Sequence, residues 1–178
     1  MGNYQDIIDK YYINKKAKNI LITHGKLVYE KALLISQNKP ELNIDEDFIE
    51  EAAMLHDIGI FLTYAPEIDC FGAYPYICHG YLGRELLDKE KMEKAALVAE
   101  RHTGAGLSSL EIKKQNLPLP HRDMIPLSIE EQLICFTDKF FSKTKNSNEI
   151  PISKIRKKML KYGEEQLKRF DNLVEIFL

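Results

Sequence analysis

The chain has 178 residues, of which 44% are hydrophobic and 29% charged, a mixture typical of globular proteins. The formal net charge of −2 gives no basic footprint for nucleic acid, and no stretch is long and apolar enough to span a bilayer, so neither partner is expected. Three cysteines without a CxxC pair, and an N-terminus without an apolar signal core, favour a reducing, cytoplasmic location.

The first half of the chain predicts two helices and a long loop. An amphipathic helix is expected over residues 19–37, where His24 shares a broad face with apolar side chains. Asp45 is the candidate N-cap of a second helix, residues 46–57, whose apolar face carries His56. The next stretch, 59–78, is rich in Gly, Pro and Tyr. Loops of this length in compact domains usually have a functional role.

The second half continues the helical pattern and completes an all-α fold. Helices are expected over 79–89, 93–101 and 107–115, and a second proline-rich loop covers 116–128. Ser128 and Glu131 form a capping pattern that starts the next helix. A charged amphipathic helix, about 152–177, closes the chain, and its basic run 154–161 is expected to be a solvated face. The sequence therefore predicts a single-domain helical bundle, residues 1–178, with its core at about 19–143.

Histidine and aspartate side chains recur on the inward faces of five of these helices or helix ends. They are His24, His56 with the adjacent Asp57, His79, His102 and Asp138. A lone histidine on an apolar face is more often a hydrogen-bonded core residue than a ligand. Two buried aspartates, however, cost several kcal/mol without a partner, and few buried Lys or Arg positions are apparent. Because imidazole and carboxylate suit iron, manganese and zinc, the set predicts a metal site.

The same residues resemble a known pattern. His24, the "HD" of His56–Asp57 in the form "HDIG", and Asp138 resemble the core ligands of the HD superfamily of metal-dependent phosphohydrolases, which are all-helical bundles. The resemblance runs from Thr23 to Lys143. His79 in "CHGYLG" and His102 in "RHTG" match the two extra histidines of members with a second metal. The histidine-Thr-Gly stretch and the later "DK" also resemble the HD-type diadenosine tetraphosphate hydrolases.

The resemblance implies a chemistry for the site. It implies two divalent metal ions, iron or manganese first and zinc, magnesium, nickel or cobalt as alternatives. His24, His56 and Asp138 would surround one ion and His79 and His102 the other, and Asp57, the residue assigned the catalytic role, would bridge them. Two such cations can lower the pKa of a shared water and hold the oxygens of a phosphoryl group. The expected activity is hydrolysis of a phosphoester or phosphoanhydride in a small, nucleotide-like substrate.

Four further residues are candidates for binding that phosphorylated small molecule. Lys139 and Arg101 each adjoin a ligand position, Thr103 follows His102, and Arg122 lies in the second loop. Three of them have an alternative, because Lys139 and Arg101 can face solvent and Thr103 can cap a helix end. The two loops, with Tyr64, Tyr74 and Tyr76, are expected to cover the mouth of the site, whereas His121 is expected at the surface.

The sequence is also compatible with an oxygenase, a phosphodiesterase or a sensor. The resemblance includes a di-iron oxygenase branch with the same ligand order and a cyclic-dinucleotide phosphodiesterase branch. Both often have a lysine directly after HDxG, where this chain has Ile60. The phosphodiesterase branch also has Gly-Tyr-Pro after its fourth histidine, where "TGAGL" follows His102. A non-catalytic metal- or nucleotide-binding sensor is a further alternative, because fold does not fix function. A homodimer is one expectation for an oligomeric state that the sequence leaves open.

Overall fold

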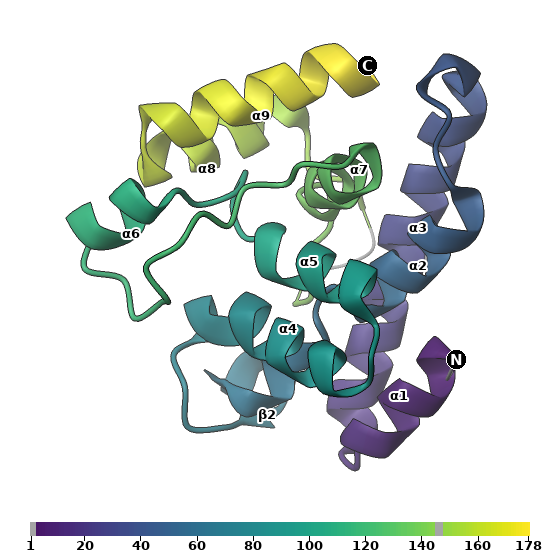
Figure 1. Cartoon of the computed structure of the whole chain (residues 1–178), viewed down its shortest axis with the longest axis vertical. Helices are drawn as coiled ribbons and strands as arrows, with labels where there is room; N and C mark the ends of the chain where they lie inside the picture. The colour runs from purple at the N-terminus through teal and green to yellow at the C-terminus, as the bar shows by residue number, and fades with distance from the viewer. Residues whose placement is uncertain (1–2, 145–147) are drawn as a thin grey trace.

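A computed structural model describes residues 3–144 and 148–178. Helices dominate these residues (Figure 1), which confirms the all-α prediction. The α-helices are α1 (Tyr4–Tyr11), α2 (Lys15–Asn38), α3 (Glu46–Leu55), α4 (His79–Lys89), α5 (Glu93–Arg101), α6 (Ser109–Lys114), α7 (Ile129–Asp138), α8 (Ile152–Tyr162) and α9 (Glu164–Phe177).

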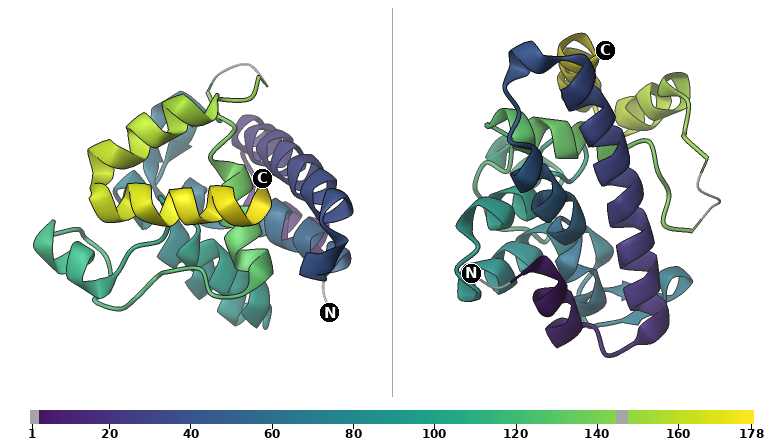
Figure 2. Two further views of the ribbon diagram at one scale, coloured as in Figure 1. Left: turned by 90° about the horizontal axis from the view of Figure 1, so that it is seen from above. Right: turned by 90° about the vertical axis from the view of Figure 1, so that its right-hand side faces the viewer.

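The helices surround a shared interior. The long α2 runs along one edge, with α3 packed beside it and α1 at its N-terminal end (Figure 2). Helices α4 and α5 form an antiparallel pair, and α7 lies between α5 and α9 (Figure 1). Helices α8 and α9 fold against each other across one end of the molecule. The middle of α2 and the ends of α3, α4, α5 and α7 thereby meet around one region, where the histidines and aspartates lie.

Side-chain caps explain why several helices begin where they do. The side chain of Asn14 accepts hydrogen bonds from the backbone N–H groups of the first turn of α2. Asp45 does the same for α3, and Ser128 for α7, as the sequence predicts. Helix α6 begins at a complete capping box formed by Ser108 and Glu111. These caps satisfy backbone donors that the helices cannot satisfy internally.

The loop between α3 and α4 is more ordered than its composition suggests. It contains the 3₁₀ turns η2 (Ile58–Leu62), η3 (Pro66–Ile68) and η4 (Tyr76–Cys78), and a two-stranded antiparallel sheet of β1 (Tyr64–Ala65) and β2 (Cys70–Phe71). Gly59 lies against α4 so closely that a Cβ there would be 2.3 Å from the carbonyl oxygen of His79. The glycine is therefore required for close packing of the HDIG turn on α4.

Three helix predictions need correction. The C-terminal helix predicted over 152–177 is two helices, because Gly163 has a φ of +134°, a conformation that side-chain-bearing residues rarely adopt. The second predicted helix ends at Leu55, with His56 as its C-cap, so Asp57 lies beyond the helix. Helix α1, which the sequence analysis does not predict, buries Ile7 and Ile8.

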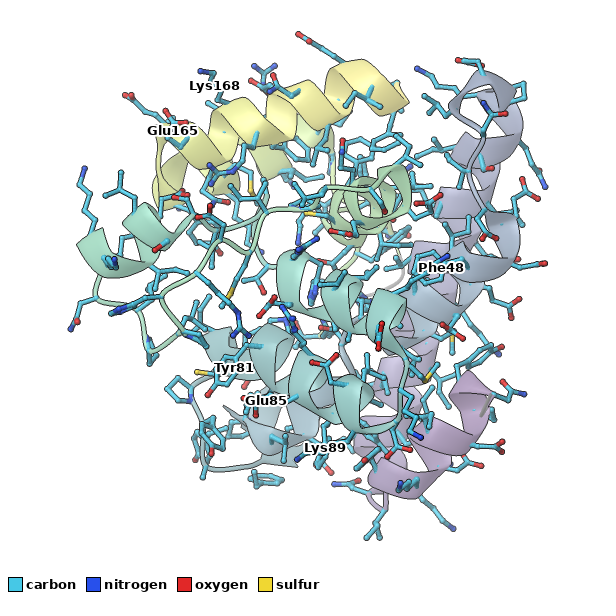
Figure 3. All side chains as sticks on the ribbon, in the orientation of Figure 1. Phe48, Tyr81, Glu85, Lys89, Glu165 and Lys168 are labelled. Atoms are coloured by element: carbon cyan, nitrogen blue, oxygen red, sulfur yellow. The ribbon has the colours of Figure 1, made fainter. Side chains whose placement is uncertain are left out.

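The core is divided into clusters on either side of the shared interior. One joins α2, α3, α7 and the α8–α9 pair around Phe136 and Phe170, and a second joins α1, α2, α3 and α5 around Leu55 and Ile58. Glu165 and Lys168 project from the outer side of α9 (Figure 3), as expected of an amphipathic helix. Within residues 3–144 and 148–178, no helix is both long and apolar enough to cross a membrane.

Candidate metal centre

Two groups of possible ligands meet at Asp57. In the first, His24 Nε2 lies 2.8 Å from Asp138 Oδ1 and 3.5 Å from Asp57 Oδ2, and His56 Nε2 lies 3.1 Å from the same Oδ2. This first group consists of His24, His56, Asp57 and Asp138, and one ligand atom from each of them lies within 4.8 Å of the others. All four side chains are largely buried, with Asp57 0% exposed. This arrangement can hold one metal ion.

The second group contains the other oxygen of Asp57. His79 Nε2 lies 3.4 Å and His102 Nε2 3.5 Å from Asp57 Oδ1, and the two imidazole nitrogens are 3.0 Å apart. Each oxygen of the Asp57 carboxylate therefore faces a different pair of histidines. The structure thus brings together all six residues that the sequence predicts as ligands, with Asp57 between the two groups.

Three of the imidazoles are held by backbone carbonyls of their own turn. His56 Nδ1 lies 2.7 Å from the carbonyl oxygen of Ala53, and His102 Nδ1 lies 2.8 Å from that of Ala99. His79 Nδ1 makes the equivalent contact, at 2.7 Å, with a carbonyl three residues earlier. A ring that donates through Nδ1 keeps its Nε2 lone pair free. Such contacts to the non-ligating nitrogen are typical of metal-bound histidines.

The polar atoms at the centre fit a divalent metal. Among the described residues, His56 Nε2 and Asp57 Oδ1 are buried without a hydrogen-bond partner, and Asp57 Oδ2 has the ammonium group of Lys143 at 2.6 Å. Unpartnered buried polar atoms are uncommon in folded proteins and costly when they occur. The donor set of imidazole nitrogens and carboxylate oxygens suits iron, manganese or zinc. A metal bound by these atoms would satisfy them together.

Two buried lysines correct one step of the sequence analysis. Lys143 Nζ lies 2.6 Å from Asp57 Oδ2, and Lys139 Nζ lies 2.6 Å from Asp138 Oδ2. Lys139 also donates to the carbonyl oxygen of His102 at 2.8 Å. The expectation that few cationic side chains are buried near the aspartates is therefore wrong. The helical pattern could not identify Lys143, because α7 ends at Asp138 and the direction of later side chains follows no helical period.

The charges at the centre shift its pKa values in both directions. Burial lowers the pKa of His24 to about 4 and that of His79 to about 3, so both rings are neutral near pH 7. Burial also opposes the charged form of His56, but the nearby carboxylates outweigh it and raise its pKa to about 9. Burial disfavours the Asp57 carboxylate, yet His56 and Lys143 hold its pKa well below the usual range. A metal must therefore displace the proton of His56 when it binds.

A cavity of about 1210 Å³ opens onto this centre. His79, His102 and Asp138 line one part of it, together with Lys139 and Lys143. Its volume exceeds the roughly 300–1,000 Å³ typical of small-molecule sites. A smaller cavity of about 490 Å³ borders His24 and Lys143. The ligand residues are thus accessible to a sizeable substrate.

The predicted substrate residues separate into two pairs. Lys139 and Thr103 line the large cavity. Arg101 instead donates to both carboxylate oxygens of buried Glu131, at 3.1 and 2.8 Å, and Arg122 pairs with buried Glu100 at 2.5 Å. The structure does not bring these two arginines to the cavity, because each neutralises a buried glutamate that would otherwise lack a countercharge.

The aromatic residues and loops around the cavity also differ from expectation. Of the three tyrosines expected at the mouth, Tyr76 lines the cavity and stacks on His79 with ring centroids 4.7 Å apart. Tyr64 and Tyr74 are exposed elsewhere on the loop. His121 is exposed, as expected, and Ile60 is fully buried in the core. Helix α8 also contributes to the cavity through Lys154 and Lys158, which the sequence pattern does not indicate.

Comparison with curated proteins gives relatives of two kinds. The uncharacterized protein MJ0778 of Methanocaldococcus jannaschii is 32% identical over 146 residues, which are 82% of this chain and 78% of that protein. A tRNA (cytidine(56)-2′-O)-methyltransferase of Picrophilus torridus is 32% identical over 130 residues, 72% of this chain. The enzyme of the same name from Thermoplasma volcanium is 29% identical over 164 residues, 91% of this chain.

The methyltransferase matches cover only part of those enzymes. The aligned segment spans 33% of the Picrophilus protein and 43% of the Thermoplasma protein, so the similarity concerns less than half of each. No solved structure matches the chain. A family model described as "HD domain" matches residues 21–142, a range that contains His24, the His56–Asp57 pair and Asp138. With the helical fold and the buried ligand set, this match shows that the chain belongs to the HD domain family, which is of the metal-dependent hydrolase type.

Proposed function

We propose that the protein is a metal-dependent phosphohydrolase that cleaves a phosphoester or phosphoanhydride bond in a small, nucleotide-like molecule. The observation that carries the proposal is the position of Asp57. Its two carboxylate oxygens face separate histidine pairs, at the edge of a cavity that also contains lysines. Two divalent metals held there, iron or manganese, would lower the pKa of a water and neutralise charge on a phosphoryl group.

The chain's own residues support binding of a phosphorylated substrate. Lys139 and Lys143 place two ammonium groups beside the ligand residues, where they can bind phosphate oxygens. Thr103 lines the same cavity and can donate its hydroxyl group. Tyr76 provides an aromatic surface, which suits a base or another planar group. Each of these interactions recognises a small anionic molecule.

The alternatives are an oxygenase and a non-catalytic sensor. This chain matches less than half of each methyltransferase relative. The names of those enzymes therefore support neither the oxygenase nor the sensor. The position occupied by a lysine in the oxygenase branch holds Ile60, which is buried in the core away from any ligand. The oxygenase therefore gains no support from that position.

The test is an assay of manganese- and iron-loaded protein against a panel of nucleotides, dinucleoside polyphosphates and sugar phosphates, with and without oxygen. We expect release of phosphate or nucleotide from at least one substrate at the same rate under both atmospheres. Turnover that requires oxygen would establish the oxygenase alternative. Tight binding of a nucleotide without turnover, by protein with a full metal complement, would establish the sensor.

A further inference from the structure

The large cavity extends beyond the metal centre to helix α8. At one part of its wall are His79, His102 and Asp138, and at another are Lys154 and Lys158 of α8. Helix α8 comes from a segment that follows the ligand-bearing helices and folds against α9 (Figures 1 and 2). A single phosphate at the metals would leave the α8 part of the cavity empty.

Lys154 and Lys158 face the cavity together because they are four residues apart on one helix. Both side chains are exposed, and within residues 3–144 and 148–178 neither forms an ion pair or hydrogen bond with an acidic side chain. Like charges at this spacing repel each other and destabilise a helix. An anion bound between the two ammonium groups would remove that repulsion.

Two of the three carboxylates on the cavity wall, Asp138 and Glu149, have other charged partners. Asp138 pairs with Lys139 and with His24, and Glu149 pairs with Lys31 at 3.0 Å. Glu67 lies on the loop before α4, in the turn η3. Burial and the positive charges of Lys139 and Lys143 lower the pKa of Lys158, and the negative charge of Asp138 opposes them. The field along this wall is therefore favourable to anions.

We propose that Lys154 and Lys158 form a second anion subsite, which binds a phosphate group separated from the one at the metal centre. This inference rests on the proposed function and narrows its substrate to small molecules with phosphate groups at two positions joined by an organic spacer. Tyr162, one turn beyond Lys158, also lines the cavity and offers an aromatic face to the spacer, such as a nucleobase. In the basic run 154–161, which the sequence predicts to be a solvated face, Lys154 and Lys158 would thus have a binding role.

The helix provides a matched control for the test. Lys157 and Lys161 have the same spacing and are exposed, but they do not line the cavity. The variants are therefore Lys154→Gln/Lys158→Gln and, as control, Lys157→Gln/Lys161→Gln. Both remove two positive charges from the same helix, so a general change in net charge or helix stability affects them equally.

The experiment measures binding by calorimetry to manganese-loaded protein, with AMP and adenosine 3′,5′-bisphosphate as probes. We expect the unmodified protein and the control to bind the bisphosphate about tenfold more tightly than AMP, the effect of charge-assisted hydrogen bonds to one further phosphate. Lys154→Gln/Lys158→Gln should abolish this preference and leave AMP affinity and metal content unchanged.

Two results would overturn the subsite. One is equal affinity of the unmodified protein for the two probes, and the other is an equal loss of preference in both variants. A protein that shows the preference but hydrolyses no phosphate compound would retain the subsite and lose the proposed hydrolase function. A protein that hydrolyses a phosphate compound but shows no preference for the bisphosphate would retain the hydrolase function and lose the subsite.

Discussion

Lys143 and Asp57 form an ion pair inside the metal centre, with 2.6 Å between Nζ and Oδ2. The same carboxylate oxygen belongs to the first ligand group. An ammonium group and a divalent cation at one oxygen repel each other, so Lys143 competes with metal in the arrangement described. In the absence of metal, however, it neutralises a carboxylate that is 0% exposed.

The first prediction is that Lys143→Met has opposite effects on metal affinity and on the stability of metal-free protein. Manganese should bind about tenfold more tightly, because the lost repulsion exceeds the roughly 1.4 kcal/mol that this change requires. The metal-free protein should lose about 1.5–3 kcal/mol of unfolding free energy, because Asp57 then keeps only the protonated His56 as a countercharge. Calorimetric titration and urea unfolding in EDTA measure the two effects. Weaker manganese binding would show instead that Lys143 supports the metal.

The second prediction concerns the metal count. His79→Ala should lower the metal content from two equivalents to one, because His79 belongs only to the group with His102 and Asp57. His24→Ala should remove the other equivalent, since His24 contacts Asp138. Elemental analysis of purified protein checks both. Unchanged metal content in His79→Ala would exclude the dinuclear assignment.

The third prediction concerns Asp57 itself. Asp57→Asn should remove both equivalents and all activity, because the residue contributes to both ligand groups and its negative charge is lost. Asp88→Asn, at a half-exposed carboxylate on α4 paired with Arg84, is the control and should retain full metal content. Retention of two metals by Asp57→Asn would show that the histidines suffice.

The fourth prediction distinguishes the two roles considered for Arg122. Its pairing with Glu100, which is 1% exposed, indicates a structural role. Arg122→Gln should therefore leave KM unchanged and lower the unfolding free energy by about 1 kcal/mol, since the arginine is 47% exposed and Arg84 still pairs with Glu100. A several-fold rise in KM without loss of stability would identify Arg122 as a substrate contact.

The fifth prediction is a pH dependence of stability at α6. Burial raises the pKa of Glu111, but hydrogen bonds from Arg169 and Ser108 outweigh it and hold the pKa below its usual range. The contribution of Glu111 is therefore complete above its ordinary pKa and is lost as the pH falls through the lower folded-state value. At pH 7, Glu111→Gln should cost about 1–2 kcal/mol in metal-free protein. The difference from the unmodified protein, measured by urea unfolding, should shrink towards pH 3.

The sequence predicts the ligands because they lie on, or directly follow, helices with an apolar periodicity. His24 and His56, for example, share their faces with buried apolar residues, and this pattern fixes their direction before any tertiary contact is known. The periodicity also fails in defined ways. The apolar side chain of Leu34 in α2, for example, is 57% exposed. A glycine such as Gly163 can lie inside a helix, so the sequence alone does not show that its positive φ separates α8 from α9.

Residues outside the periodic segments could not be placed in this way. Lys143 follows the end of α7, and its direction depends on how the chain leaves the helix. Lys154 and Lys158 do lie on a helix, but only the packing of α8 beside the cavity distinguishes them from Lys157 and Lys161. Tertiary arrangement, rather than local pattern, therefore decides which cations can meet a substrate.

The attachment of three imidazoles to carbonyls of their own turn has a consequence for how this centre can change. His56, His79 and His102 are oriented by backbone carbonyls three residues earlier, and none of these carbonyls belongs to α8. The α8 wall can then be replaced while the ligand residues stay aligned. The same set of metal ligands can in this way be combined with different substrate-binding walls, and a change of substrate then requires no change in the ligands.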